Sequence, residues 1–208
     1  MAKTRPTYVC GACGARTPQW QGQCPACQAW NTLELAASAL SLPSARSAPA
    51  GKAASRTVTE ITQETESRAV SGIGELDRVL GGGLVAGSVI LLGGDPGIGK
   101  STLLLQAADA LSRDRPVLYA SGEESVRQVA LRARRLGLES GTLRLVAETR
   151  VEAILEEALS ARASVLVVDS IQTMHTELSE SSPGSAVQVR ESAARLVRFA
   201  KDTATTVL

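Results

Sequence analysis

Apolar runs alternate with amphipathic segments along most of the chain, and this pattern predicts its secondary structure. Four short apolar runs bounded by turn residues indicate buried strands at 89–92, 117–120, 143–146 and 165–168. Segments with helical spacing lie between or after them, at 102–112, 125–136, 151–161 and 187–201. Strands that alternate with helices in this way are typical of a parallel sheet, so we expect an α/β fold.

Capping residues indicate where several of these elements begin and end. Ser71 is expected to cap a short helix over 72–80, which the three glycines at 81–83 end. Gly137 is expected to end the helix at 125–136. The last four residues, 205–208, are three β-branched residues and a leucine that follow a helix, and they predict the start of another strand.

The composition divides the chain into three parts. Residues 1–34 contain all four cysteines and both tryptophans. Residues 35–56 are mostly Ala, Ser, Pro and Gly, and we expect a flexible linker because such a segment cannot bury enough apolar surface to order itself. Residues 57–208 carry the alternating strands and helices and form the second domain.

The cysteines form two C-x-x-C pairs separated by ten residues, Cys10 with Cys13 and Cys24 with Cys27. Each pair places two thiolates on one tight turn, and two such turns make the tetrahedral S₄ shell that Zn²⁺ prefers. The alternatives are a redox pair, which is expected beside a βαβ pattern, or two disulfides. We expect a structural Zn²⁺ that supplies much of the folding free energy, with the two tryptophan rings as packing.

Residues 94–101 read Gly-Asp-Pro-Gly-Ile-Gly-Lys-Ser and match the P-loop pattern G-x-x-x-x-G-K-[ST]. The strand before the run and the helix after it argue against the alternative, a glycine-rich turn with a chance lysine. Such a loop aims backbone N–H groups at phosphates beside the positive end of a helix. Lys100 is expected to reach the β- and γ-phosphates of ATP, and Ser101 to hold Mg²⁺. The expected nucleotide-binding residues are Gly94, Asp95, Pro96, Gly97, Ile98, Gly99, Lys100, Ser101 and Thr102.

Three acidic residues follow predicted strands. Asp169 ends the apolar strand at 165–168, where P-loop enzymes present a carboxylate to Mg²⁺, although an acid there is often only a helix cap. Glu123 and Glu124 follow the strand at 117–120, and ligands of open α/β sheets bind at that edge. Glu123 is the preferred candidate to activate water, with Lys100 as its catalytic partner and Glu124 as the alternate. Either glutamate would also suit the first turn of the next helix.

Charge and hydropathy restrict the remaining classes of function. The net charge is +1, so the chain has no global basic field. Local clusters could bind phosphates, although arginines at this spacing are more typical of a solvated helix face. The N-terminus lacks the apolar stretch of a signal peptide, and no apolar run approaches the roughly 18 residues of a membrane span, so we expect a cytoplasmic protein. The clusters are Arg127, Arg132, Arg134 and Arg135, and Arg190, Arg195, Arg198 and Lys201.

The combination of motifs resembles a known family. The runs at 70–77, 81–84 and 93–102 resemble the core of the RecA-type ATPases, and the four-cysteine module before them is similar to that of the bacterial DNA repair family RadA, also called Sms. The runs at 121–125 and 169–174 fit the same family. The resemblance covers the whole chain except the linker.

The resemblance implies a DNA-dependent ATPase that processes recombination intermediates by branch migration. It implies a hexameric ring around single-stranded or branched DNA, a RecA-type recombinase as partner, and no membrane. It also implies that Glu123 activates water and that residues 175–186 form a mobile loop facing the DNA. In RecA-type cores the strand corresponding to 205–208 lies between the P-loop strand and the Asp169 strand, so we expect it to be central.

Members of this family continue with a KNRFG motif and a Lon-protease-like domain, which the 208 residues do not contain. We therefore expect an ATPase core that is incomplete at its C-terminus, less stable than a longer chain and weak in turnover. A second class of function stays open, a RecA-fold regulatory protein that binds a protein partner in a nucleotide-dependent way. The stimulation of ATP hydrolysis by DNA separates the two classes.

Overall fold

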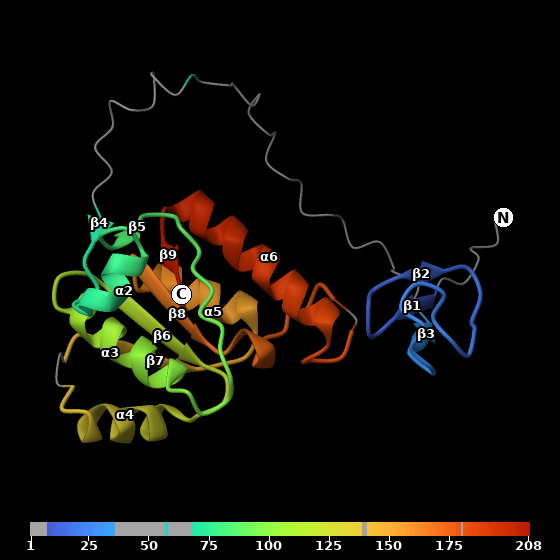
Figure 1. The fold of residues 1–208 in the computed structure, drawn as a ribbon, viewed down its shortest axis with the longest axis horizontal. Helices are drawn as coiled ribbons and strands as arrows, with labels where there is room; N and C mark the ends of the chain where they lie inside the picture. Colours follow the sequence, from blue (N-terminus) through green and yellow to red (C-terminus); the bar gives the residue numbers. More distant parts are fainter. Residues whose placement is uncertain (1–7, 36–56, 58–67, 139–140, 180) are drawn as a thin grey trace.

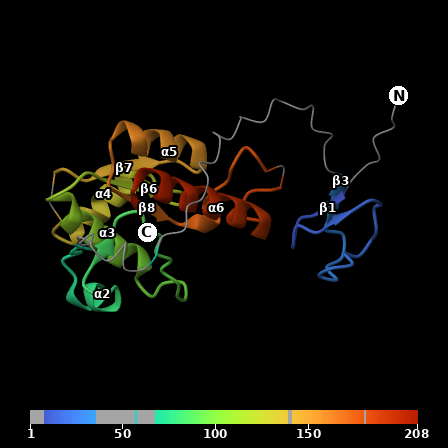
Figure 2. The same cartoon turned by 90° about the horizontal axis from the view of Figure 1, so that it is seen from above.

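The computed structural model describes residues 8–35, 57, 68–138, 141–179 and 181–208 (Figures 1 and 2). The predicted linker at 35–56 lies almost entirely outside the described residues, as do the first seven residues. Within the described part, no helix has both the length and the apolar character needed to cross a membrane.

The cysteine module is a small antiparallel sheet. Its three strands are paired in the order β2-β1-β3, and its buried residues are few. Both tryptophans are exposed, Trp20 to 56% and Trp30 to 69%, so the expectation that their rings pack the module is wrong. Gly22 lies against the Trp30 ring, and the Trp20 indole N–H donates to the carbonyl of Leu33 (3.1 Å), which holds each ring at the surface. The strands are β1 (Tyr8–Cys10), β2 (Arg16–Thr17) and β3 (Leu33–Leu35).

The second domain is built on a parallel sheet with the strand order β7-β6-β8-β9, which confirms the predicted fold class. The predicted strand at 89–92 joins this sheet only through a parallel bridge between Val89 and Val207. The N–H of Ile90 donates to the carbonyl of Val207 (2.8 Å), so β9 lies between the P-loop segment and β8 as expected. The strands are β6 (Val117–Ser121), β7 (Arg144–Ala147), β8 (Val165–Asp169) and β9 (Thr206–Val207).

Helices cover both faces of this sheet, and alternate strand residues point to each. In β8, Val165 and Val167 pack in the cluster that contains α3 and α4, whereas Leu166 and Val168 pack in the cluster that contains α5 and α6. Strands buried on both faces read as continuous apolar runs, which explains the sequence pattern. The helices are α3 (Lys100–Ser112), α4 (Val126–Arg135), α5 (Val151–Ser160) and α6 (Ala186–Thr203), and a 3₁₀ turn, η1 (Ile171–Thr173), follows β8.

Local signals set most helix ends. Ser125 and Gln128 form a reciprocal capping box at the start of α4, and Gly137, with φ +69°, follows its end. The cap predicted at Ser71 is wrong, because α2 (Gly74–Val79) begins three residues later with Ile73 as its N-cap. The Ser71 hydroxyl instead accepts from the N–H of Ile73 (3.2 Å) in the approach to the helix. The antiparallel pair β4 (Arg68–Ala69) and β5 (Leu84–Val85) brackets α2.

Gly122 marks a close approach at the carboxyl end of the sheet. Its N–H donates to the carbonyl of Asp169 (2.9 Å), which joins the ends of β6 and β8. A Cβ at this position would lie 2.0 Å from the Thr173 hydroxyl oxygen and 3.0 Å from Cε of Met174, which is fully buried. The segment after β8 therefore packs directly on the backbone that carries Glu123.

We expect Gly122→Ala to lower the free energy of unfolding by about 1–3 kcal/mol, because the added methyl group must displace η1. Urea denaturation measures the change. Gly74→Ala is the matched control, since its Cβ would meet nothing within 4 Å and alanine favours the helix. Equal stability of the two variants would contradict the close approach.

Candidate functional site

The P-loop connects the segment at 89–92 to the N-terminus of α3. Gly97 and Gly99 have φ values of +80° and +102°, a left-handed conformation that residues with a Cβ rarely adopt. Gly99 is also the N-cap of the 13-residue helix α3, so the loop ends at the positive pole of a helix dipole. The loop can thus present backbone N–H groups and a helix terminus to an anion. Residues 94–99, Ile98 included, are exposed, while Thr102 is half-buried in the first turn of α3.

Lys100 folds back over this loop. Its ammonium group donates to the carbonyl oxygens of Gly94 (2.7 Å) and Asp95 (2.8 Å). The charge is therefore held directly above the loop, at the position where phosphates would approach. Release of these two neutral acceptors would free the ammonium for a phosphate oxygen, which forms a stronger, charge-assisted hydrogen bond.

Asp169 connects the P-loop helix to the centre of the sheet. Its Oδ1 accepts from the hydroxyl of Ser101 (3.0 Å), a residue 68 positions earlier in the sequence. Its Oδ2 accepts from the hydroxyl of Tyr119 (2.5 Å), which lies on the neighbouring strand β6. The structure thus brings together the hydroxyl and the carboxylate that the sequence assigned to Mg²⁺. Oxygen ligands of this kind suit Mg²⁺ together with nucleotide phosphates.

The two glutamates after β6 have different environments. Glu124 forms an ion pair with Arg132 of α4, so its charge is already compensated. Glu123 is exposed, and its Oε1 accepts from the hydroxyl of Ser170 (2.8 Å), which follows Asp169 directly. Glu123 therefore lies beside the carboxylate of the candidate Mg²⁺ site, whereas Glu124 is bound to a helix. This difference favours Glu123 as the group that faces a reacting water.

Tyr119 is a residue of this site that sequence reasoning missed. Its side chain is fully buried, and burial together with the hydrogen bond to Asp169 raises its pKa above the usual value, so the hydroxyl stays a donor. The available signal was a lone tyrosine in an otherwise apolar strand, because a buried phenol needs an acceptor.

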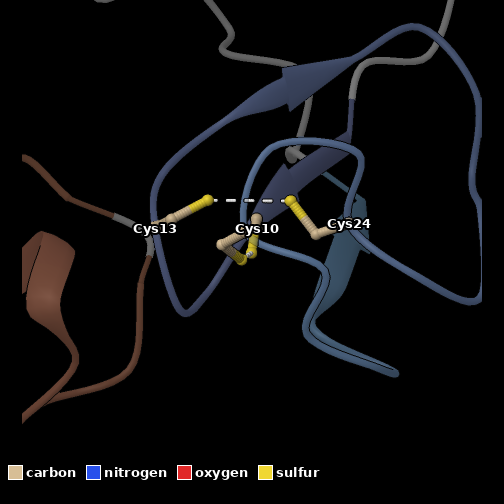
Figure 3. A group of neighbouring side chains, drawn as sticks. Cys10, Cys13 and Cys24 are labelled. Atoms are coloured by element: carbon tan, nitrogen blue, oxygen red, sulfur yellow. Dashed lines mark hydrogen bonds between the residues drawn. The ribbon is translucent and has the colours of Figure 1, made fainter.

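The four cysteine sulfurs lie close together, and Figure 3 shows this for Cys10, Cys13 and Cys24. All four lie within 4.8 Å of one another; Sγ of Cys10 is 3.7 Å from that of Cys27, and Sγ of Cys13 is 3.6 Å from that of Cys24. A tetrahedral Zn²⁺ with bonds of about 2.3 Å places its sulfurs roughly 3.8 Å apart, so the residues fit the metal. A disulfide needs about 2.05 Å, and all four cysteines are free.

Hydrogen bonds in the knuckles favour the thiolate form of Cys10 and Cys24, but not of Cys13. The backbone N–H of Ala15 lowers the pKa of Cys13, whereas the Cys27 thiol, burial and the other two cysteines raise it to about 12. Burial alone would raise the pKa of Cys10, but donors from the Thr32 hydroxyl and the N–H groups of Cys13 and Ala12 lower it to about 6. The backbone N–H of Cys27 is the main group that lowers the pKa of Cys24. Thiolates are the form that binds zinc.

The two basic clusters do not form one surface. The clusters lie on α4 and α6, which pack on opposite faces of the sheet, and each gives one arginine to an internal ion pair. Arg132 is bound to Glu124, and Arg195 is bound to Glu152 (2.9 Å). The exposed members are Arg127, Arg134 and Arg135 on α4, and Arg190, Arg198 and Lys201 on α6.

The segment at 175–186 is attached to α6 through Gln188, whose side chain is buried. Its amide nitrogen donates to the carbonyls of Ser179 (3.0 Å) and Ser181 (2.8 Å), and its Oε1 accepts from the N–H of Thr176 (2.9 Å). His175 pairs with Arg150 through a parallel backbone bridge, and among the described residues it is not part of the cysteine cluster. One buried amide thus forms hydrogen bonds to three residues of the segment that is predicted to be a mobile loop.

Residues 54–208 match the family model described as AAA domain, which covers well over half of the chain. The chain belongs to the AAA domain family. Residues 8–34 match a second model, described as rubredoxin metal binding domain, in agreement with the cysteine geometry.

The chain is similar to several proteins named DNA repair protein RadA. The Pseudomonas aeruginosa protein is 51% identical over 209 residues, covering 100% of this chain and 46% of that protein. The Escherichia coli protein is 49% identical (97% and 45% covered), and the Bacillus subtilis protein is 46% identical (97% and 45%). These relatives confirm the resemblance inferred from the motifs. The chain spans less than half of their length.

A crystal structure of a KaiC-like protein from Pyrococcus horikoshii shares the fold, with a TM-score of 0.56 over 68% of each chain. The sequences are 23% identical, so the likeness concerns the fold alone.

We expect the chain to bind one Zn²⁺ through Cys10, Cys13, Cys24 and Cys27, and its chelation to unfold the cysteine module while the parallel sheet stays folded. The physical reason is the small core of that module, which contains two of its own ligands among its few buried side chains. Metal analysis of protein purified without chelator, and circular dichroism before and after chelation, measure both effects. A Zn²⁺ content near zero, or loss of the whole fold on chelation, would contradict the assignment.

Proposed function

We propose that the chain is the zinc-binding module and ATPase domain of a DNA-dependent motor that acts in recombinational DNA repair in the cytoplasm. The observation that carries the proposal is the contact between Ser101 and Asp169 at the foot of the P-loop. The similarity to proteins named for DNA repair supports the biological role.

The arrangement of the site residues supports the proposed steps of ATP binding and hydrolysis. The loop amides and Lys100 would bind the phosphates of ATP, and Ser101 and Asp169 would hold Mg²⁺, which supplies charge neutralisation between the β- and γ-phosphates. Glu123 would accept a proton from the attacking water, with the Ser170 hydroxyl fixing its orientation. Hydrolysis would be coupled to movement on single-stranded or branched DNA and to branch migration.

The segment at 175–186 is the proposed DNA-facing loop. It begins two residues after the end of the turn that packs on Gly122, so a shift at the nucleotide site would reach it through few intermediates. Exposed cations on α6 follow the same segment and could contact phosphates. The resemblance to the RadA family further supports a hexameric ring and a RecA-type recombinase as partner.

We expect single-stranded DNA to raise the rate of ATP hydrolysis several-fold. We also expect Lys100→Ala to weaken ATP binding about tenfold to a hundredfold, because this variant loses a charged hydrogen-bond donor to the phosphates. Phosphate release with and without DNA, and titration with a fluorescent nucleotide, measure the two effects. The full-length Pseudomonas aeruginosa relative serves as reference for the assay. A chain that hydrolyses ATP at a rate unchanged by DNA would favour the regulatory alternative; wild-type affinity in Lys100→Ala would contradict the nucleotide site.

We expect Glu123→Gln to keep ATP binding and to lower turnover about 10²- to 10⁴-fold, because the amide keeps the shape but cannot accept a proton. Glu124→Gln is the matched control, since it removes the same charge one residue later and breaks the pair with Arg132. If Glu124→Gln abolishes turnover and Glu123→Gln does not, the assignment of the base is wrong.

A further inference from the structure

Tyr119 occupies the middle of β6, a position at which a phenylalanine would pack equally well. Its ring lies in the apolar cluster with α3 and α4, and the whole residue is 0% exposed. A buried hydroxyl without a partner costs about 1–3 kcal/mol, so the presence of an oxygen at this position requires an acceptor. That acceptor is Oδ2 of Asp169, at 2.5 Å.

Strand register places the phenol beneath the carboxylate. Tyr119 is paired with Val167, and Ser121 with Asp169, so tyrosine and aspartate are diagonal neighbours on adjacent parallel strands. Both point to the face of the sheet that α3 covers, because Val165 and Val167 of β8 also do. The phenol therefore approaches the aspartate from within the core, and the serine approaches it from the P-loop.

The two donors use different oxygens of the same carboxylate. With Oδ2 bound to Tyr119, the carboxylate cannot rotate without breaking that hydrogen bond, and Oδ1 stays directed at Ser101. Glu124 and Arg132 of α4 also lie near Tyr119, and the charges of these two residues compensate each other in an ion pair.

We propose that Tyr119 is a positioning residue for the metal half of the site: its hydroxyl fixes the rotation of the Asp169 carboxylate and so sets the affinity for Mg²⁺ bound with the nucleotide. This inference rests on the proposed role of Asp169 and Ser101 in holding Mg²⁺. Tyr119 itself touches neither metal nor nucleotide. It acts through Asp169, and its loss affects the metal-dependent part of nucleotide binding alone.

The test is a Mg²⁺ titration of nucleotide binding by wild type and Tyr119→Phe. A fluorescent ATP analogue reports affinity from zero added divalent cation upward, in buffer without chelator so that the cysteine module keeps its zinc. We expect the variant to need roughly tenfold more Mg²⁺ for half-maximal enhancement, since a hydrogen bond to a charged group is lost. Affinity without Mg²⁺ is expected to stay close to wild type, whereas the melting temperature is expected to fall by a few degrees because the folded state loses the same hydrogen bond.

Tyr8→Phe is the matched control, because it removes the other tyrosine hydroxyl of the chain and lies in β1 of the cysteine module. A second variant pair isolates the coupling: in an Asp169→Asn background, Tyr119→Phe is expected to cause no further change in Mg²⁺ dependence. A tyrosine that only stabilises the fold would instead lower nucleotide affinity equally with and without Mg²⁺, and that outcome overturns the inference. An unchanged Mg²⁺ dependence also overturns it.

The same titration separates this inference from the proposed function. If the wild-type chain binds nucleotide without any enhancement by Mg²⁺, the proposed metal site fails and the role of Tyr119 fails with it. If wild type is Mg²⁺-dependent and Tyr119→Phe matches it, only the role of Tyr119 fails.

Discussion

The carboxylate of Asp169 joins the two parts of the chain on which the candidate site depends. It lies at the end of a central strand, and it accepts one hydrogen bond from the first turn of the P-loop helix and one from the neighbouring strand. Hydrogen bonds to an ionised group contribute about 1.5–3 kcal/mol each, more than neutral ones. The position of the phosphate-binding loop relative to the sheet is therefore set by a charged acceptor, and not by apolar packing alone.

The alternation of strand side chains divides the domain into two environments. The face covered by α3 and α4 carries the phosphate loop, the tyrosine and the aspartate, whereas the face covered by α5 and α6 carries the segment that Gln188 holds. The two environments meet at the carboxyl ends of the strands, where Gly122 and the 3₁₀ turn after β8 are in contact. The proposed nucleotide site and the proposed DNA-facing segment therefore lie on opposite faces of the sheet and meet at one edge of it.

Much of this arrangement follows from the sequence because the motifs are local. A P-loop, two C-x-x-C knuckles and an apolar run ending in aspartate each specify a conformation within ten residues, and the structure brings their groups together. The role of Tyr119 could not be predicted, because it depends on the register between β6 and β8. In that register Tyr119 is paired with Val167, which is 48 positions later in the sequence. The partners of Arg132 and Arg195 depend likewise on how helices pack.

Two further predictions are wrong because tertiary contacts override local preference. The tryptophan rings are predicted to pack the module, but two of its few buried residues are the ligands Cys10 and Cys24, and both rings are exposed. Ser71 was expected to cap a helix because the residue type suits that position, but the chain turns for two more residues before the helix begins. Local preference is a weak guide wherever tertiary contacts choose among several acceptable conformations.

The position of β9 has a consequence for the order of folding. The segment that carries the phosphate loop contacts the rest of the sheet through Val207, which is synthesised more than a hundred residues later than Val89. Pairings of such long sequence separation form late, because the loop must be closed before any contact compensates for the lost chain entropy. On the ribosome, the phosphate loop therefore emerges well before β9, the strand that pairs with the segment preceding the loop. We therefore expect the pairing of the P-loop segment with β9 to form only after residue 207 has left the exit tunnel.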